Sequence, residues 1–297
     1  EQPDVVHLSN ALLIGLAGRI REKVNALVIC SLQDEDVWVD AMHEEYRERI
    51  WKLMAEKGKD VDGFIAVSHF FAGRMKQRMK IPDDKLHVVH IGINPAAYQP
   101  SLPATDPPAI GFLSRINEEN GFGLLVDAFI ELKKEESFSS VRLIATGGMT
   151  KDDKSFINKQ VQKMQRANLS GQVDILHEFR QDRLEEFFRS ITLLSVPVLN
   201  GEAFGLYQLE ALASGVPLVQ PAVGAFPEIV EATGGGVLYQ PNTAPVLAAK
   251  LAEVLASPSR IEQMSRNGME AVAQKFDSDH LLRKTTGIYQ QIRERKQ

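Results

Sequence analysis

Residues 195–215 constrain the fold of this chain most strongly, because they combine a strand, a glycine-containing turn and a helix. An apolar, β-branched run opens the segment, a turn with two glycines follows at Asn200–Gly205, and apolar residues at helical spacing close it. A buried strand that leads through a tight turn into a helix is the anion-binding unit of open α/β sheets. The amides of Phe204, Gly205 and Leu206 would begin this helix without intrahelical partners, at the positive end of its dipole. The segment therefore predicts a phosphate site.

Two carboxylates frame the predicted phosphate site. Glu202 and Glu210 have seven residues between them. We place Glu202 in the entering turn and Glu210 about one and a half turns inside the helix. Carboxylates repel phosphates but accept hydrogen bonds from sugar hydroxyls, so phosphate and carboxylates together indicate a nucleotide sugar. The alternative is an acidic helix start, which the dipole favours, with a solvated Glu210.

Strands alternate with helices along the whole chain, which predicts parallel, doubly wound α/β sheets. A stretch with five prolines, residues 94–108, interrupts the alternation and reads as a linker. We therefore expect two Rossmann-like domains, residues 1–98 and 109–277, joined by a linker at 99–108. The expected strands are 4–7, 26–32, 62–68, 86–91, 110–116, 141–146, 173–176, 191–198, 217–220 and 237–239.

Charge and cysteine content exclude some classes of function. The net charge of −5 argues against a general nucleic-acid binder. The single cysteine, Cys30, excludes an intrachain disulfide and fits a reducing compartment, and no signal-like segment opens the chain. We expect a cytoplasmic protein and leave open peripheral contact of a local basic patch with the inner face of a membrane.

The segment around the two glutamates also resembles a known family. Glu202 and Glu210 enclose Phe-Gly-Leu at 204–206 and precede Leu-Glu-Ala-Leu-Ala-Ser-Gly-Val-Pro at 209–217. This pattern resembles the E-x7-E signature of retaining glycosyltransferases of family 4, and the resemblance runs from about residue 4 to the C-terminus. It implies the GT-B architecture, in which two Rossmann-like domains face a cleft that holds the site. It further implies that the chain enters its N-terminal domain partway and that a helix at 278–297 packs back on that domain.

The resemblance implies transfer of a hexosyl group, with retention, from a nucleotide-diphosphate sugar to a hydroxyl of a glycan, lipid or small molecule. In the mechanism usual for the family, the leaving phosphate takes the proton of the acceptor, so no protein nucleophile, metal or further cofactor is required. A non-catalytic nucleotide-sugar-binding homologue of the same fold is the alternative, and a GT-B-like epimerase or phosphorylase is a third, weaker one.

The resemblance gives several residues of the second half roles toward the donor. Glu202 would hold sugar hydroxyls, Glu210 the ribose diol, and Arg115, at the end of strand 110–116, would donate to the diphosphate. Asn120 stands where the family has a lysine, and it can assist by hydrogen bonding without a charge. Gly224 belongs to a turn that would shape one wall of the donor pocket, next to the amides of residues 204–206.

Residues of the first half carry less specific signals. Gln33 stands where many family members have a histidine near the reacting sugar carbon, and it could hydrogen-bond a sugar hydroxyl but carry no proton. Asp34-Glu35-Asp36 matches the D-x-D pattern of metal-dependent glycosyltransferases of another fold. We interpret these acids as capping the next helix and expect no metal site. His177, in the second half, is an outside candidate for a base or a ribose contact.

Overall fold

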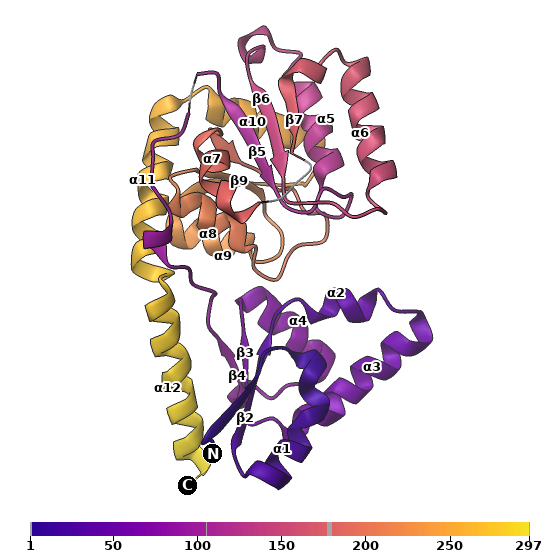
Figure 1. Ribbon diagram of the computed structural model, residues 1–297, viewed down its shortest axis with the longest axis vertical. Helices are drawn as coiled ribbons and strands as arrows, with labels where there is room; N and C mark the ends of the chain where they lie inside the picture. The colour runs from indigo at the N-terminus through magenta and orange to yellow at the C-terminus, as the bar shows by residue number, and fades with distance from the viewer. Residues whose placement is uncertain (1, 105, 177–179, 297) are drawn as a thin grey trace. The chain divides into compact units, whose positions relative to one another are not determined.

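The computed structural model describes residues 2–104, 106–176 and 180–296, which form two compact units (Figure 1). The first unit comprises Glu1–Gly92, Glu202–Phe204 and Ser278–Gln297, and the second comprises Ile93–Gly201 and Gly205–Asp277. The division differs from the expected boundaries in two places. The expected linker 99–108 belongs to the second unit, and three residues of the expected second domain make their contacts in the first unit.

The first unit is built on a four-stranded sheet in the order β1-β2-β3-β4, with every neighbouring pair parallel. The strands are β1 Val5–Leu8, β2 Leu27–Leu32, β3 Gly63–Ala66 and β4 Leu86–Val88. The connecting helices are η1 Ala11–Leu16, α1 Ala17–Val24, α2 Glu35–Asp40, α3 Glu44–Lys57, η2 Gly58–Asp60, α4 His69–Met79 and η3 Asp83–Lys85. Because the strands follow one another in order and such crossovers are right-handed, the connecting helices cover one face of this sheet.

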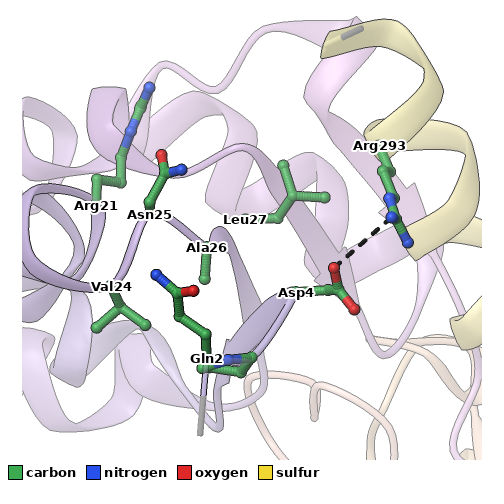
Figure 2. Close-up of a pocket in the computed structure, with 9 residues that line it drawn as sticks. Gln2, Asp4, Arg21, Val24, Asn25, Ala26, Leu27 and Arg293 are labelled. Atoms are coloured by element: carbon green, nitrogen blue, oxygen red, sulfur yellow. Dashed lines mark ion pairs between the residues drawn. The ribbon is translucent and has the colours of Figure 1, made fainter.

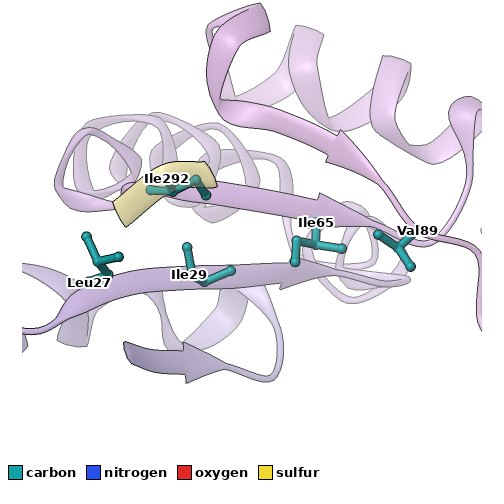
Figure 3. Packing of buried hydrophobic residues seen from close by; sticks show 5 residues of the cluster. All are labelled: Leu27, Ile29, Ile65, Val89 and Ile292. Atoms are coloured by element: carbon teal, nitrogen blue, oxygen red, sulfur yellow. The ribbon is translucent and has the colours of Figure 1, made fainter. Parts of the chain in front are cut away.

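The last helix, α12 Ser278–Lys296, covers the other face of the first sheet (Figure 3). Ile292 of α12 is buried in a cluster with Leu27 and Ile29 of β2 and with Ile65 of β3. Gly63 of β3 permits this contact, because a Cβ there would lie 2.4 Å from Ile292 Cδ1. The missing side chain therefore lets the helix lie directly on the sheet.

A polar contact also joins α12 to the sheet. The two ring nitrogens of His7 on β1 hydrogen-bond to Tyr289 Oη of α12 (2.5 Å) and to Ser31 Oγ of β2 (2.8 Å). Burial lowers the pKa of His7. The face of the sheet under α12 thus carries an apolar cluster and a hydrogen-bonded bridge.

The second unit is built on a six-stranded parallel sheet in the order β10-β9-β8-β5-β6-β7. Its strands are β5 Ala109–Leu113, β6 Arg142–Thr146, β7 Val173–Ile175, β8 Leu193–Leu194, β9 Leu218–Pro221 and β10 Gly236–Tyr239. The helices are η4 Pro95–Ala97, α5 Phe122–Leu132, η5 Glu136–Phe138, α6 Lys154–Arg166, η6 Ser170–Gln172, η7 Gln181–Arg183, α7 Leu184–Arg189, α8 Leu206–Ala213, α9 Phe226–Thr233, α10 Ala244–Leu255 and α11 Pro258–Lys275. Two parallel, Rossmann-like sheets confirm the predicted α/β class.

The strand order of the second sheet reverses between β5 and β8. The chain runs outward from β5 through β6 to β7, returns to β8 beside β5, and then runs outward through β9 to β10. In open α/β sheets, ligands bind outside the carboxyl ends of the strands at such a reversal. Within residues 2–104, 106–176 and 180–296, every helix is too short or too polar to cross a lipid bilayer.

Candidate functional site

Three loops of the second unit leave the carboxyl ends of β5, β8 and β9, which are neighbours in the sheet. The first loop contains Arg115 and Asn120, the second leads through Gly205 into α8 at Leu206, and the third contains Gly224. Because parallel strands end at the same edge of a sheet, these five predicted donor-binding residues share the edge at the order reversal.

The loops after β5 and β8 are held against each other. Gly121 has a φ of +79°, and a Cβ there would lie 1.9 Å from the carbonyl oxygen of Pro197. Two residues further along the second loop, the Leu199 amide donates to the carbonyl of Glu119 at 3.0 Å. Only glycine satisfies both the left-handed φ and the close approach, so the position of each loop fixes that of the other.

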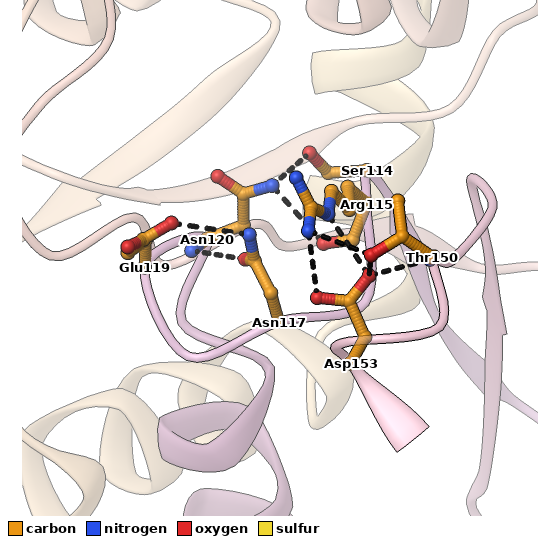
Figure 4. Close-up of polar contacts among 7 residues, drawn as sticks. All are labelled: Ser114, Arg115, Asn117, Glu119, Asn120, Thr150 and Asp153. Atoms are coloured by element: carbon orange, nitrogen blue, oxygen red, sulfur yellow. Dashed lines mark hydrogen bonds and ion pairs between the residues drawn. The ribbon is translucent and has the colours of Figure 1, made fainter. Parts of the chain in front are cut away.

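Arg115 is held by two residues from the segment before α6 (Figure 4). Its Nε donates to Asp153 Oδ2 at 2.9 Å, and its Nη2 donates to Asp153 Oδ1 at 3.0 Å and to Thr150 Oγ1 at 2.9 Å. The side chain of Arg115 is 47% exposed, whereas that of Asp153 is 6% exposed. The hydrogen bond from Arg115 holds the pKa of Asp153 below its ordinary value. The predicted phosphate-binding guanidinium therefore has a fixed orientation on one edge.

Asn120 stabilises the loop that carries Arg115. Its side-chain nitrogen donates to Ser114 Oγ and to the carbonyl oxygen of Arg115, both at 3.0 Å, and its backbone amide donates to Asn117 Oδ1 at 2.9 Å. Both side-chain N–H groups thus have partners in the loop (Figure 4). In this structure Asn120 shapes the loop, and its side-chain nitrogen already donates both of its hydrogen bonds within that loop.

Glu210 lies on α8 and receives a hydrogen bond from the segment before β5. Tyr98 Oη donates to Glu210 Oε1 at 3.0 Å. Burial raises the pKa of Glu210, and the hydrogen bond from Tyr98 acts in the opposite direction. Burial, with Glu210 adding to it, also raises the pKa of Tyr98, so the phenol remains a donor. Glu210 is half-buried and keeps oxygen acceptors for a ligand.

Glu202 and Phe204 are grouped with the first unit, whereas the other donor-binding residues predicted in the second half of the chain belong to the second unit. Ser68, the N-cap of α4, donates from Oγ to the carbonyl of Ala203 at 2.6 Å, and the Phe204 ring centroid is 6.0 Å from that of His90. The expectation that one domain contains both glutamates is therefore wrong. Positive φ angles at the flanking glycines, 79° at Gly201 and 82° at Gly205, allow the chain to leave the second unit and return.

Gln33 follows β2 and holds the neighbouring loop of the first unit. Its Nε2 donates to the carbonyl of Ser9 at 2.9 Å, and its backbone amide donates to Glu35 Oε2 at 2.7 Å. Buried Glu35 also accepts from the amide of Ala11 at 2.8 Å, and burial raises its pKa. Gln33 thus lies at the carboxyl ends of β1 and β2, and its side-chain nitrogen already donates to the backbone of the first unit.

The acidic run next to Gln33 begins a helix. Glu35 and Asp36 lie in the first turn of α2, and Asp36 Oδ2 is 2.8 Å from Arg74 Nη1. Asp34 is the N-cap residue of α2 but makes no side-chain hydrogen bond to its first turn, so the capping interpretation holds only in that Glu35 and Asp36 lie at the positive end of this helix. His177 lies outside the described residues.

Two pockets of the first unit lie away from the carboxyl ends of its strands. One, of about 620 Å³, lies at the amino ends of β1 and β2 beside the ion pair of Asp4 and Arg293 (Figure 2). Another, of about 660 Å³, is lined by Trp51, Phe64 and residues that precede β4. Both lie at the edge opposite the one where ligands bind in such sheets.

Three residues of the candidate site were not predicted from the sequence. Asp153 and Thr150 bind Arg115, and Tyr98 binds Glu210. The available signal was the acidic Asp153 directly before a helix, which indicates a cap rather than a partner for Arg115. Nothing in the sequence around Tyr98, at the start of the proline-rich stretch, indicated a side-chain partner.

The chain is similar in sequence to several curated proteins. The chain is 25% identical over 318 residues to alpha-maltose-1-phosphate synthase of Mycolicibacterium smegmatis, covering 98% of this chain and 80% of the relative. It is 26% identical over 246 residues to the lipopolysaccharide core biosynthesis mannosyltransferase LpsB of Rhizobium meliloti, covering 78% and 66%. For a D-inositol 3-phosphate glycosyltransferase of Segniliparus rotundus, the identity is 27% and the coverage is 73% and 49%. The chain thus spans between half and four fifths of the length of these relatives.

Solved structures share the fold. Anabaena Alr3699/HepE in complex with UDP superposes with a TM-score of 0.83 at 18% identity, covering 97% of this chain and 79% of that chain. Sucrose-phosphate synthase from Thermosynechococcus elongatus gives a TM-score of 0.79 at 20% identity, covering 97% and 73%. The profile of "Glycosyltransferase Family 4" matches residues 1–97, and that of "Glycosyl transferases group 1" matches residues 95–271. Because the second match alone covers more than half of the chain, this chain belongs to the group 1 glycosyl transferases and has their GT-B fold.

Proposed function

We propose that this protein transfers a hexosyl group, with retention, from a nucleotide-diphosphate sugar to an acceptor hydroxyl. The observation that carries the proposal is the position of Arg115, the start of α8 and Glu210 in the second unit, beside the order reversal of its sheet. Ligands of open α/β sheets bind at such an edge, and phosphates bind at helix N-termini. Two of the relatives are named as a mannosyltransferase and a glycosyltransferase, and HepE was solved with UDP and with UDP-glucose.

Each group has a stated role in the proposal. The amides at Gly205 and Leu206 and the guanidinium of Arg115 would receive the diphosphate, and the carboxylate of Glu210 would accept hydrogen bonds from the ribose diol. Glu202 would accept from the hydroxyls of the transferred sugar, and Gln33 would hydrogen-bond a sugar hydroxyl through its amide oxygen.

The proposed reaction needs no protein nucleophile, metal or cofactor. The bond between the anomeric carbon and the diphosphate oxygen breaks, and the acceptor oxygen bonds to that carbon on the same face. The acceptor proton passes to the leaving phosphate, so the products are a glycoside and a nucleoside diphosphate. Groups that stabilise the charge developing on the diphosphate would supply the largest share of catalysis.

A binding experiment tests the donor class first. Thermal unfolding of the protein would be measured with UDP, GDP and ADP, without and with EDTA, and then with Glu210→Gln. A nucleotide at one hundred times its dissociation constant should add about 2.7 kcal/mol of stability, and the substitution should reduce this gain. The absence of a shift with all three nucleotides would refute the proposed donor class.

A non-catalytic nucleotide-sugar-binding homologue is the second candidate, and the charge of the site favours it. Asn120 provides no cation, and the charge of Arg115 is balanced by Asp153. Release of UDP, GDP or ADP from UDP-glucose, GDP-mannose or ADP-glucose, in the presence of a panel of glycan, lipid and small-molecule acceptors, would distinguish the candidates. Tight binding with no turnover across that panel would support the second candidate.

A further inference from the structure

Asp153 and Thr150 form a closed hydrogen-bonded group with Arg115 (Figure 4). The carboxylate accepts from Arg115 through both oxygens, and its Oδ2 also accepts from the Thr150 amide at 2.6 Å and from Thr150 Oγ1 at 2.9 Å. Thr150 Oγ1 in turn accepts from Arg115 Nη2 at 2.9 Å. Because Asp153 is almost fully buried, this group has little freedom to rearrange.

The geometry of the guanidinium determines what remains for a ligand. It carries five N–H groups in one plane, and the carboxylate occupies the edge formed by Nε and Nη2. Nη1 therefore points away from Asp153, and it makes no hydrogen bond to any residue in the described part of the chain. Its two N–H groups lie on a half-exposed side chain, where an anion can reach them.

We propose that Asp153 and Thr150 are positioning residues, which hold Arg115 with the Nη1 side presented to the diphosphate of the donor. The inference rests on the proposed function, because it assigns the phosphate-binding role to Arg115. The inference adds Thr150 and Asp153 to the residues that would bind the leaving group. They lie on a different loop, 35 and 38 positions after Arg115 in the chain.

The charge of the pair explains why orientation matters at this site. Arg115 and Asp153 together are neutral, and Asn120 adds no charge. The contribution of Arg115 to phosphate binding therefore comes from the direction of its remaining N–H groups rather than from net positive charge. A mobile arginine would lose that contribution, since ordering a long side chain on binding costs free energy.

The opposite role for Asp153 makes the opposite prediction. If Asp153 competed with the diphosphate for Arg115, its removal would free the guanidinium and strengthen nucleotide binding. If Asp153 only stabilised the fold, its removal would lower the unfolding temperature and leave the affinity of the folded protein unchanged. The sign of the change in affinity therefore separates these three roles.

The experiment is a double-mutant cycle on nucleotide affinity. Isothermal titration calorimetry would first identify which of UDP, GDP and ADP the full chain binds most tightly. That nucleotide would then be titrated into Asp153→Ala, Arg115→Ala, the double variant and Thr150→Val. We expect Asp153→Ala to weaken binding about ten-fold or more, by analogy with the loss of groups that orient metal ligands. Arg115→Ala should cost no more than about three-fold further in the Asp153→Ala background, because interacting residues are not additive.

Matched variants keep the test specific. Asp182 binds Arg180 in the same geometry, through Nε at 3.1 Å and Nη2 at 2.6 Å, on the exposed surface of the same unit. Asp182→Ala should bind the nucleotide within about two-fold of the wild type. Asp153→Asn keeps an oxygen acceptor and the shape of the side chain. It should bind with an affinity between those of the wild type and Asp153→Ala, and it serves in the cycle if the alanine variant does not fold.

The outcomes also separate this inference from the proposed function. Absence of binding by the wild type to all three nucleotides would refute the proposed function and the inference with it. Wild-type binding with equal or tighter binding by Asp153→Ala would overturn the inference and leave the function standing. The same loss from Arg115→Ala in both backgrounds would overturn it as well.

Discussion

Replacement of Gly121 by alanine tests the contact between the two loops at the candidate site. A non-glycine residue in the left-handed region costs about 1–2 kcal/mol, and the φ of this residue is +79°. The new Cβ would also lie 1.9 Å from the carbonyl oxygen of Pro197 and 2.5 Å from its carbonyl carbon. Backbone atoms cannot turn aside as a side chain can, so one loop must move, at a cost of about 1–3 kcal/mol for overpacking. We expect a total loss of about 2–5 kcal/mol in the free energy of unfolding.

Gly123, two positions further along, provides the matched control. It lies in α5, where an added Cβ would meet only side chains, at 3.4 Å from Gln160 Nε2 and the Phe156 ring. Alanine there should stabilise the helix by up to about 0.5–1 kcal/mol. Urea denaturation followed by circular dichroism would measure both variants, and nucleotide affinity should fall only for Gly121→Ala. Equal stability of Gly121→Ala and the wild type would refute the close approach of the two loops.

Four other substitutions test the remaining parts of the structure. Tyr98→Phe removes the hydrogen bond that lowers the pKa of Glu210, so that pKa should rise further. The ribose hydroxyls donate to the carboxylate form of Glu210. UDP titrations between about pH 7.5 and pH 5 should therefore show the affinity of the variant falling at a higher pH than that of the wild type. Identical pH profiles would contradict the hydrogen bond between Tyr98 and Glu210. Glu210→Gln should remove the contribution of this carboxylate to the pH profile and weaken binding by about ten-fold or more. Asn120→Lys adds a cation to the loop that carries Arg115, so it should bind UDP more tightly than Asn120→Ala; equal affinities would count against a diphosphate at this loop. Ile292→Ala should cost about 2–5 kcal/mol in urea denaturation, whereas Leu282→Ala, 60% exposed on the same helix, should stay within about 0.5 kcal/mol, and equal losses would contradict the packing of α12.

The fold could be predicted from the sequence because the central strands are short apolar runs that are fully buried, as in β3, β5 and β9. The run at 110–116, for instance, corresponds to β5. The run at 191–198 was a less accurate guide, since β8 contains only Leu193–Leu194. Pro197 has no N–H to give to the sheet, and the amide of Val196 donates to the side chain of Gln220 at 2.9 Å. A β-branched composition indicates extended backbone, but it does not show where that backbone finds its partners.

The partners of the site residues could not be predicted, because they are distant in sequence. Arg115 and Asp153 are 38 positions apart, and Tyr98 and Glu210 are 112 apart. Periodicity describes one element at a time, so it carries no information on which loops meet. The grouping of Glu202 with the first unit is of the same kind, since it depends on a contact between Ala203 and Ser68 rather than on local pattern.

The charges of the second unit connect these observations to the proposed chemistry. A diphosphate that approaches the carboxyl ends of β5 and β8 meets an arginine neutralised by Asp153 and an asparagine in place of a lysine. In the proposed function, positive potential would come from the backbone at the start of α8, and the rest of the attraction would come from N–H groups with fixed directions. Fixed directions are useful only if the loops that carry them keep their positions. Two features would then contribute to phosphate recognition in the same way: the close approach of Gly121 to Pro197, and the group formed by Arg115, Asp153 and Thr150. Both limit the directions in which the N–H groups of this site can point.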